Sequence, residues 1–259
     1  MPFVPALKEW VESHVIQVPN ELIRFCVDIT GKGILDVGCG DMLSDFGLLA
    51  RGPRKIIGLD VHRHPKDILG RTAATIRDAG LELPAAYETR LEYVQYEGNV
   101  FPFPDNSFDL VYSWSAFEHI PDVPKALSEI RRVVKPDGRV FIQVYPWFPS
   151  FWGSHLTDYI DEPFFHLSRP DAWVHERLTE YCAAHPEKRD FILGHMWGEY
   201  RTLNKHSAKR FISSVLAVGF CIDKLESILR LDYLDKIPPD TAKADVISAG
   251  TLVYLLPAK

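Results

Sequence analysis

Cysteine is scarce in this chain: it has 4 among 259 residues, and no two of them form a C-x-x-C pair. This spacing argues against a disulfide framework and against a cysteine zinc site, so we expect free thiols. Long apolar runs are missing too. The longest, such as residues 215–222 and 252–256, fall far short of the ~20 residues that cross a bilayer. No basic segment followed by an apolar one marks a secretory signal, and we therefore expect a cytoplasmic protein.

Basic residues are in deficit as well. The 29 lysines and arginines are outnumbered by 35 acidic residues, and they form no long basic run. Nucleic acid is therefore an unsupported partner, since binding to phosphates without sequence preference depends on clustered positive charge. Internal repeats and low-complexity tracts are also absent. What remains is a globular composition, 46% hydrophobic and 25% charged, in a chain long enough to bury a core.

From Gly33 onward, short apolar runs alternate with helix-like segments. The clearest helix opens at Pro124, and the turn residues 135–138 end it. Strands that alternate with helices pair in parallel through right-handed crossovers, which predicts a doubly wound, Rossmann-like α/β sheet. Strands are predicted at residues 34–37, 55–59, 91–94, 109–112 and 139–144.

The rest of the chain flanks this core. Residues 5–30 have the apolar spacing of N-terminal helices, and residues 145–200 hold four of the 6 tryptophans and five of the 10 histidines. A helix at 207–218 and strands near 220–226 and 250–256 follow, with an exposed connection at 237–245. We expect a single domain over residues 1–259. It would consist of N-terminal helices (1–30), a core (31–145), an aromatic insertion (146–205) and a C-terminal helix with two strands (206–259).

The segment from Ile34 to Met42 predicts a strand that runs into a glycine turn and then a helix. Gly38 and Gly40 let a ligand approach the backbone, although they could simply make a tight turn. Asp60 ends the next strand, twenty residues after Gly40, where a doubly wound fold places an acid beside a ribose. A strand-end cap is the alternative for Asp60.

Two classes of enzyme share this pattern, nicotinamide-dependent dehydrogenases and methyltransferases. A dinucleotide-binding turn needs a third glycine at position 43, where this chain has Leu43. Asp36 would also repel a pyrophosphate, whereas it suits a cationic ligand such as S-adenosylmethionine. These two residues favour the methyltransferases.

Five segments in the correct order resemble the class I S-adenosylmethionine-dependent methyltransferases, and most of all the subgroup that methylates ubiquinone and menaquinone precursors at carbon. The resemblance covers about residues 31–145 and, weakly, 203–220. It implies S-adenosylmethionine as the cofactor, a sheet of about seven strands and an antiparallel pairing of the last two. The segments are 34–40, 57–60, 101–111, 118–120 and 129–138.

The resemblance also implies the cofactor-binding residues. Asp36, Gly38 and Gly40 would line the methionine part, and Asp60 would hold the ribose. Asn99 would approach the adenine amino group, although the family more often has Asp there and a longer linker to Pro102. The rest of the predicted set, at or beside these positions, is Cys39, Val61, Val100 and Ser113. For Ser113, at the end of a strand, ordinary packing is as good an explanation.

The aromatic segment that begins at Tyr145 is expected to select the acceptor. Rings dotted with polar groups suit a pocket for an apolar or aromatic small molecule, while a self-packed cap and a homodimer interface are the alternatives. Tyr145, His119 and His155 are the candidates for deprotonating a substrate. If the turn at His155 is helical, Asp158 would orient it. The later histidines are dispersed without an H-x-x-x-H pair, so we expect no metal site.

These inferences together predict a methyltransferase that acts on a small molecule by in-line displacement. Such an enzyme mainly aligns the acceptor behind the methyl group and excludes water. An oxidoreductase that uses a nicotinamide dinucleotide is one alternative. The other is a non-catalytic protein that binds the cofactor and interacts with a partner through its aromatic segment.

Overall fold

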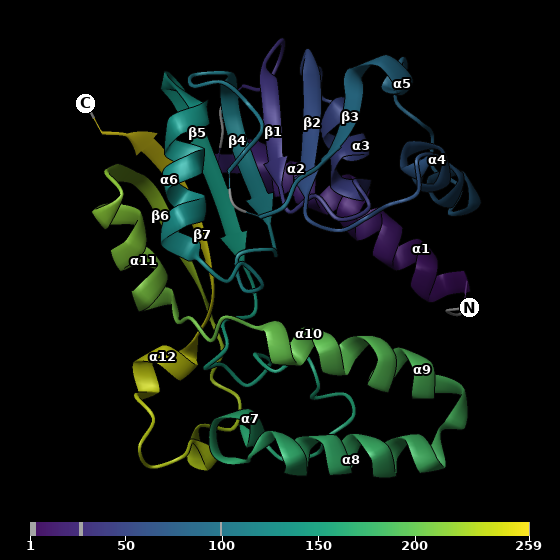
Figure 1. Ribbon diagram of the computed structural model, residues 1–259, viewed down its shortest axis with the longest axis vertical. Helices are drawn as coiled ribbons and strands as arrows, with labels where there is room; N and C mark the ends of the chain where they lie inside the picture. Colours follow the sequence, from purple (N-terminus) through teal and green to yellow (C-terminus); the bar gives the residue numbers. More distant parts are fainter. Residues whose placement is uncertain (1–3, 26–27, 99, 259) are drawn as a thin grey trace.

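The computed structural model describes residues 4–25, 28–98 and 100–258 (Figure 1). Its described residues form a 7-stranded sheet in the order β3-β2-β1-β4-β5-β7-β6. Strands β1 to β5 are parallel, and β7 is antiparallel to both β5 and β6. The doubly wound sheet and the C-terminal antiparallel hairpin are thus confirmed. The strands are β1 (Gly33–Val37), β2 (Lys55–Asp60), β3 (Leu91–Gln95), β4 (Phe108–Trp114), β5 (Val134–Val144), β6 (Phe220–Leu229) and β7 (Ser248–Pro257).

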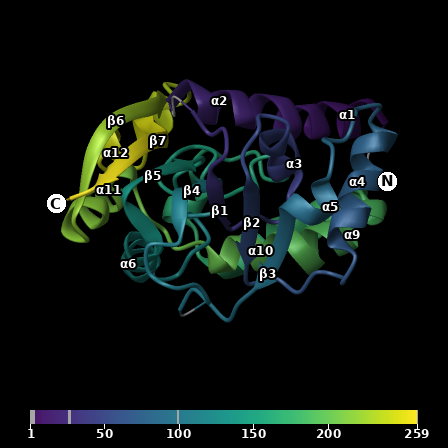
Figure 2. The same ribbon diagram turned by 90° about the horizontal axis from the view of Figure 1, so that it is seen from above.

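Helices cover both faces of the sheet, as Figure 2 shows. Strand β1 is buried at all of its positions, with Ile34 in the hydrophobic cluster of one face and Leu35 in that of the other. This is the pattern of a central parallel strand, which has no solvated side. One face carries α1 (Val4–Glu12), a π-helical turn (Ser13–Gln17), α2 (Val18–Phe25), α3 (Leu43–Leu49), α4 (Ile68–Asp78) and α5 (Tyr87–Arg90); the other carries α6 (Val123–Val133) and α11 (Ala208–Ala217).

Helix α6 begins and ends as the sequence predicts, but the residues that follow it differ from the prediction. The Asp122 side chain caps its first turn by accepting a hydrogen bond from the Lys125 backbone, and Pro124 follows the cap. The turn predicted at residues 135–138 is wrong, because β5 starts directly at Val134. Those residues form a bulge opposite Asp109, whose carboxylate pairs with Lys135 at 2.6 Å and holds the irregular strand in place.

The aromatic insertion forms a helical layer beyond the carboxyl ends of β4 and β5 (Figure 1). It has a hydrophobic cluster of its own, which includes Phe148, Phe165 and Leu178. The rings of this segment therefore largely bury one another. Its elements are α7 (Phe165–Ser168), α8 (Asp171–Ala184), a 3-10 turn (Pro186–Lys188), α9 (Arg189–Phe191), a π-helical turn (Ile192–Met196) and α10 (Trp197–Thr202).

The connection from β6 to β7 is mostly exposed, as expected. It also contains a 3-10 turn (Leu234–Lys236) and a short helix, α12 (Lys243–Ile247), that the sequence did not predict. Val246 alone anchors α12 through a buried side chain. No helix in the described ranges combines the length and the apolar character that a membrane span needs.

Three of the cysteines are free, as predicted: Cys39, Cys182 and Cys221. Cys26 lies outside the described residues.

Candidate active site

The turn after β1 is made by two glycines with different roles. Gly38 and Gly40 both have positive φ angles, 79° and 51°. A Cβ at position 38 would lie 2.4 Å from the Cβ of Ala116, so this glycine permits close packing of the loop after β4. A Cβ at position 40 would meet nothing within 4 Å. The backbone at Gly40 therefore borders open space that a ligand can enter.

Asp60 ends β2, as predicted, and its carboxylate fastens two loops. Its Oδ2 accepts a hydrogen bond of 2.9 Å from the Gly40 backbone, and its Oδ1 accepts from the backbone and the Nδ1 of His62. The side chain is only 6% exposed in relative terms. Because each carboxylate oxygen has two lone pairs, Oδ2 retains the capacity to accept from a ligand hydroxyl. The sequence did not indicate a role for His62.

Asp36 lies at the centre of a buried acidic cluster. It is 3% exposed, and its Oδ1 has no hydrogen-bond partner among the described residues. Burial, together with the neighbouring carboxylates of Asp45 and Asp60, raises the pKa of Asp36 well above its usual value. Burial also raises the pKa of Asp45 to about 8. Buried acids without a countercharge are the environment that a cationic ligand would satisfy.

Asp45 is not among the site residues that the sequence predicts. The signal available was a single acid in the otherwise apolar segment of α3, where it is completely buried. Such a residue is unusual, because a buried carboxylate loses its hydration.

Two of the predicted cofactor-binding residues are exposed valines. Val61, which follows Asp60 in the chain, is 50% exposed, and Val100 is 58% exposed. A Cβ at Gly98 would lie 3.5 Å from Val61 Cγ1, which places the turn before Val100 beside Val61. This arrangement leaves an apolar surface that a planar ring can cover. Asn99, the predicted adenine contact, lies outside the described residues.

Ser113 and Cys39 lie near the predicted cofactor site, but their side chains are buried. The Ser113 hydroxyl is buried and donates a 2.7 Å hydrogen bond to the carbonyl oxygen of Val37, which joins β4 to β1. This bond favours the packing alternative for Ser113. The Cys39 thiol packs at the position where a Cβ on Gly58 would be, and burial raises the pKa of this thiol well above its usual value.

A cavity of about 360 Å³ that is open to solvent lies between the end of β5, the insertion and the segment after β6. Both apolar rings and polar groups face it, which suits a partly apolar small molecule. Among the predicted candidates for deprotonation, Tyr145 and His155 contribute to its wall. The lining residues are Tyr145, Pro146, Trp152, His155, Thr157, Asp158, Met196 and Arg230.

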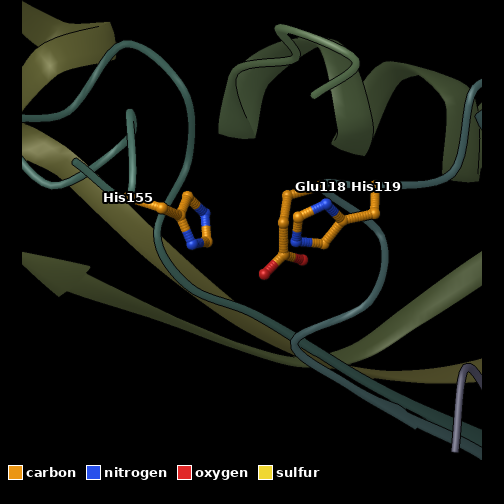
Figure 3. A group of neighbouring side chains, drawn as sticks. All are labelled: Glu118, His119 and His155. Carbon is orange, nitrogen blue, oxygen red and sulfur yellow. The ribbon is translucent and has the colours of Figure 1, made fainter. Parts of the chain in front are cut away.

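His155 also takes part in a cluster with Glu118 and His119, which Figure 3 shows. One nitrogen or oxygen atom from each side chain lies within 4.8 Å of the others, and the two imidazole centroids are 5.4 Å apart. Burial raises the pKa of Glu118 to about 8. Burial, and then His119, lowers the pKa of His155 to about 4, and burial also lowers the pKa of His119. Burial therefore disfavours the charged form of both imidazoles.

The sequence predicts that Asp158 orients His155 if the turn at His155 is helical, and this condition is not met. The turn is not helical, because His155 has a left-handed φ of 58°. No hydrogen bond joins His155 to Asp158 in the described structure, and the His155 ring faces His119 instead.

Residues at the end of the insertion hold the loop that carries Glu118 and His119. The Asn204 backbone donates a 3.0 Å hydrogen bond to the Glu118 carbonyl, and its side-chain amide donates to the carbonyls of Phe117 and Ile120. Glu199 on α10 places its Oε2 3.4 Å from the Nδ1 of His119. No sequence pattern marks Asn204 or Glu199, because their contacts with the loop bridge about eighty residues.

Comparison with known proteins identifies the core. Residues 35–142 match the family described as a methyltransferase domain. A sterol 24-C-methyltransferase from Gibberella zeae is 35% identical over 45% of this chain and 28% of its own length. A ubiquinone/menaquinone biosynthesis C-methyltransferase from Escherichia coli is 30% identical over 64% of this chain and 66% of its own length. The chain thus spans from about a quarter to about two thirds of these relatives.

Solved structures match over more of the chain. An S-adenosylmethionine-dependent methyltransferase from Mesorhizobium loti superposes with a TM-score of 0.55 and 17% identity, covering 91% of this chain and 95% of that one. The cyclase SpnF has the same TM-score and identity, covering 94% and 82% of the two chains. At these identities the likeness concerns the fold alone. The relatives lend no support to a nicotinamide-dependent oxidoreductase.

Proposed function

The chain belongs to the class I S-adenosylmethionine-dependent methyltransferases, and we propose that it transfers a methyl group from S-adenosylmethionine to a small-molecule acceptor. The observation that carries the proposal is the buried carboxylate of Asp36, whose Oδ1 lacks a hydrogen-bond partner among the described residues. S-adenosylmethionine brings an ammonium and a sulfonium to such a place. A pyrophosphate, by contrast, would bring further negative charge to a cluster of three acidic side chains, Asp36, Asp45 and Asp60.

The other residues near the glycine turn fit the remaining parts of the cofactor. Asp60 would hold the ribose through its free acceptor capacity, and Val61 and Val100 would cover the adenine. Asn99 stays the proposed contact of the adenine amino group. Gly38, Cys39 and Gly40 would shape the methionine side, and Ser113 would act by fixing β4 to β1. The bound cofactor supplies a methyl carbon that its sulfonium has already activated.

The protein's own contribution is to position the acceptor and to exclude water. The insertion covers the carboxyl ends of the strands, and the 360 Å³ cavity gives an acceptor a place beside His155. We propose an acceptor that is partly apolar or aromatic.

An acceptor that reacts through a hydroxyl or a ring carbon also has to lose a proton. Tyr145, His119 and His155 stay the proposed groups for this step. His155 is the first choice, because it both lines the cavity and faces Glu118 and His119.

The division of the chain into core, insertion and C-terminal part also stays a proposal, supported by the separate hydrophobic cluster of the insertion. A cytoplasmic location is supported by the free thiols, which are typical of a reducing compartment.

Association of two copies through the aromatic insertion would be detected by light scattering coupled to size exclusion.

Calorimetric titration tests the cofactor. Ligand-free protein should bind S-adenosylmethionine and its demethylated product, and should not bind NAD. Asp60→Ala should weaken this binding by roughly 1.5–3 kcal/mol, the range for hydrogen bonds to charged groups. Asp78→Ala, on the exposed side of α4, is the matched control and should bind as the wild type does. Binding of NAD alone would refute the methyltransferase proposal, and an unchanged affinity in folded Asp60→Ala would remove Asp60 from the site.

A further inference from the structure

The cluster of Glu118, His119 and His155 has the composition of a metal site. Glu118 and His119 come from the loop after β4, and His155 comes from the insertion, so two separate segments bring the groups together (Figure 3). Glu118 Oε2 and His155 Nε2 are buried and have no hydrogen-bond partner among the described residues. Buried polar atoms normally have partners, and two unpartnered atoms in one cluster of metal-ligating side chains point to a bound cation.

The distances between the three ligand atoms need only small changes for the cluster to hold an ion. The ligand atoms lie within 4.8 Å of one another, whereas ligands at about 2.1 Å from a tetrahedral zinc are roughly 3.4 Å apart. Side-chain torsions can close this difference, because His119 and His155 lie on loops and are partly exposed.

Glu199 determines which nitrogen of His119 can bind the metal ion. Its Oε2 lies 3.4 Å from Nδ1, on the α10 side, which leaves Nε2 for the cluster. Metal-bound histidines commonly direct their second nitrogen to a carboxylate in this way, since the contact orients the ring. No lysine or arginine forms an ion pair with Glu118 in the described structure, so no protein cation takes the place of an ion.

The donor set selects the kind of metal. Two imidazoles and one carboxylate suit zinc, iron(II), cobalt or manganese, whereas magnesium and calcium prefer sites built from oxygen. Three protein ligands also leave coordination positions open. Since His155 lines the cavity, these positions would face the proposed acceptor.

We propose that Glu118, His119 and His155 bind one divalent transition-metal ion, which holds an oxygen atom of the acceptor. This inference rests on the proposed function. The metal would favour loss of the proton of an acceptor hydroxyl to solvent, and this would replace direct proton transfer to His155. The carbon–sulfur bond of the cofactor then breaks as the acceptor forms its bond to the methyl carbon, and the thioether leaves. The acceptor class is a phenol or an enol, for which methylation at oxygen or at carbon both begin from the deprotonated oxygen.

Metal binding can be measured without any cofactor or acceptor. Chelator-treated full-length protein is titrated with cobalt(II), followed by its visible absorption, and with zinc(II) by calorimetry. The wild type should bind one ion. Glu118→Gln keeps the shape of the side chain, and His155→Asn keeps a residue that tolerates a left-handed φ. Each variant should bind at least about tenfold more weakly. His195→Ala, at an exposed position of the insertion, should bind as the wild type does.

Two outcomes would overturn the proposal: no binding of either ion to the wild type, or equal affinity in folded wild type, Glu118→Gln and His155→Asn. Thermal melting of each variant verifies folding. Titration of the same preparations with S-adenosylmethionine separates the two proposals. If the cofactor binds and the metal does not, only the metal site fails; if the metal binds and the cofactor does not, the proposed function fails.

Discussion

Asp45 illustrates how one buried residue can set the pH response of the protein. Its carboxyl group is completely buried, and burial raises its pKa from 3.8 to about 8. In the folded protein the group therefore keeps its proton up to about pH 8, whereas the unfolded chain releases it near pH 4. Between these values the folded state binds more protons, so this residue lowers the free energy of unfolding as the pH rises.

Asp45→Asn should remove that loss of stability. The amide keeps the shape of the side chain, but it cannot ionise. We expect the variant to gain stability relative to the wild type as the pH increases from 5 to 8, with urea unfolding as the measurement. Asp78→Asn on α4 is the exposed control and should leave the pH dependence unchanged. A gain that is constant over this range would contradict the assigned role.

The site residues that can be predicted from the sequence are those that lie in a recognisable local pattern. Asp36, Gly40 and Asp60 stand at strand ends, and the parallel topology brings such ends to one edge of the sheet. Asp45, Glu199 and Asn204 were missed because their partners are distant in sequence or because burial alone makes them significant. No spacing rule joins position 155 to positions 118 and 119.

At the scale of elements, the loop after β4 depends on the segment that follows α10. Asn204 is the connection, since its amide donates to carbonyls on both sides of Glu118. Asn204→Ala should remove these bonds and lower stability by roughly 1–3 kcal/mol, the range for unsatisfied buried partners.

The same variant should lower the rate of methyl transfer more than the affinity for S-adenosylmethionine, because Asn204 supports the acceptor side. Asn20→Ala, whose amide oxygen accepts from Arg51 at the surface, is the matched control. Urea unfolding and cofactor titration on both variants give the comparison. Equal losses of cofactor affinity and of methyl-transfer rate would contradict this prediction, because the loop would then support the cofactor side as much as the acceptor side.

The strands were predicted well because they are short apolar runs bounded by turn residues. The start of β5 was missed since proline and glycine normally end an element, while here they form a bulge that pairing with β4 retains. Helix α12 has one buried residue, Val246, and so offers no apolar periodicity to recognise.

At the scale of the whole molecule, Trp147 joins the insertion to the sheet. Its ring is buried against Phe211, its indole donates a 2.8 Å hydrogen bond to Thr251 and its backbone donates to Ala249. Trp147→Phe should cost roughly 1–3 kcal/mol, because Thr251 loses its partner and the smaller ring leaves space.

If the insertion and the core form one cooperative folding unit, they should unfold together in Trp147→Phe. Fluorescence and far-ultraviolet circular dichroism would then report coincident transitions in urea. Trp10→Phe, at a position that is 43% exposed, is the control and should cost little. Separate transitions in the wild type would indicate that the insertion unfolds on its own.

The position of β6 at the outer edge of the sheet has a consequence for how the protein behaves when concentrated. A long strand with one unpaired side can recruit a strand from another molecule and so begin aggregation. Here the pairing of β6 with β7 is broken by two irregularities, and charged side chains such as Asp223 and Glu226 lie along the strand. Arg24 of α2 also binds Glu226 through both carboxylate oxygens. These features make the edge a poor template, and so favour molecules that stay separate in a crowded cell.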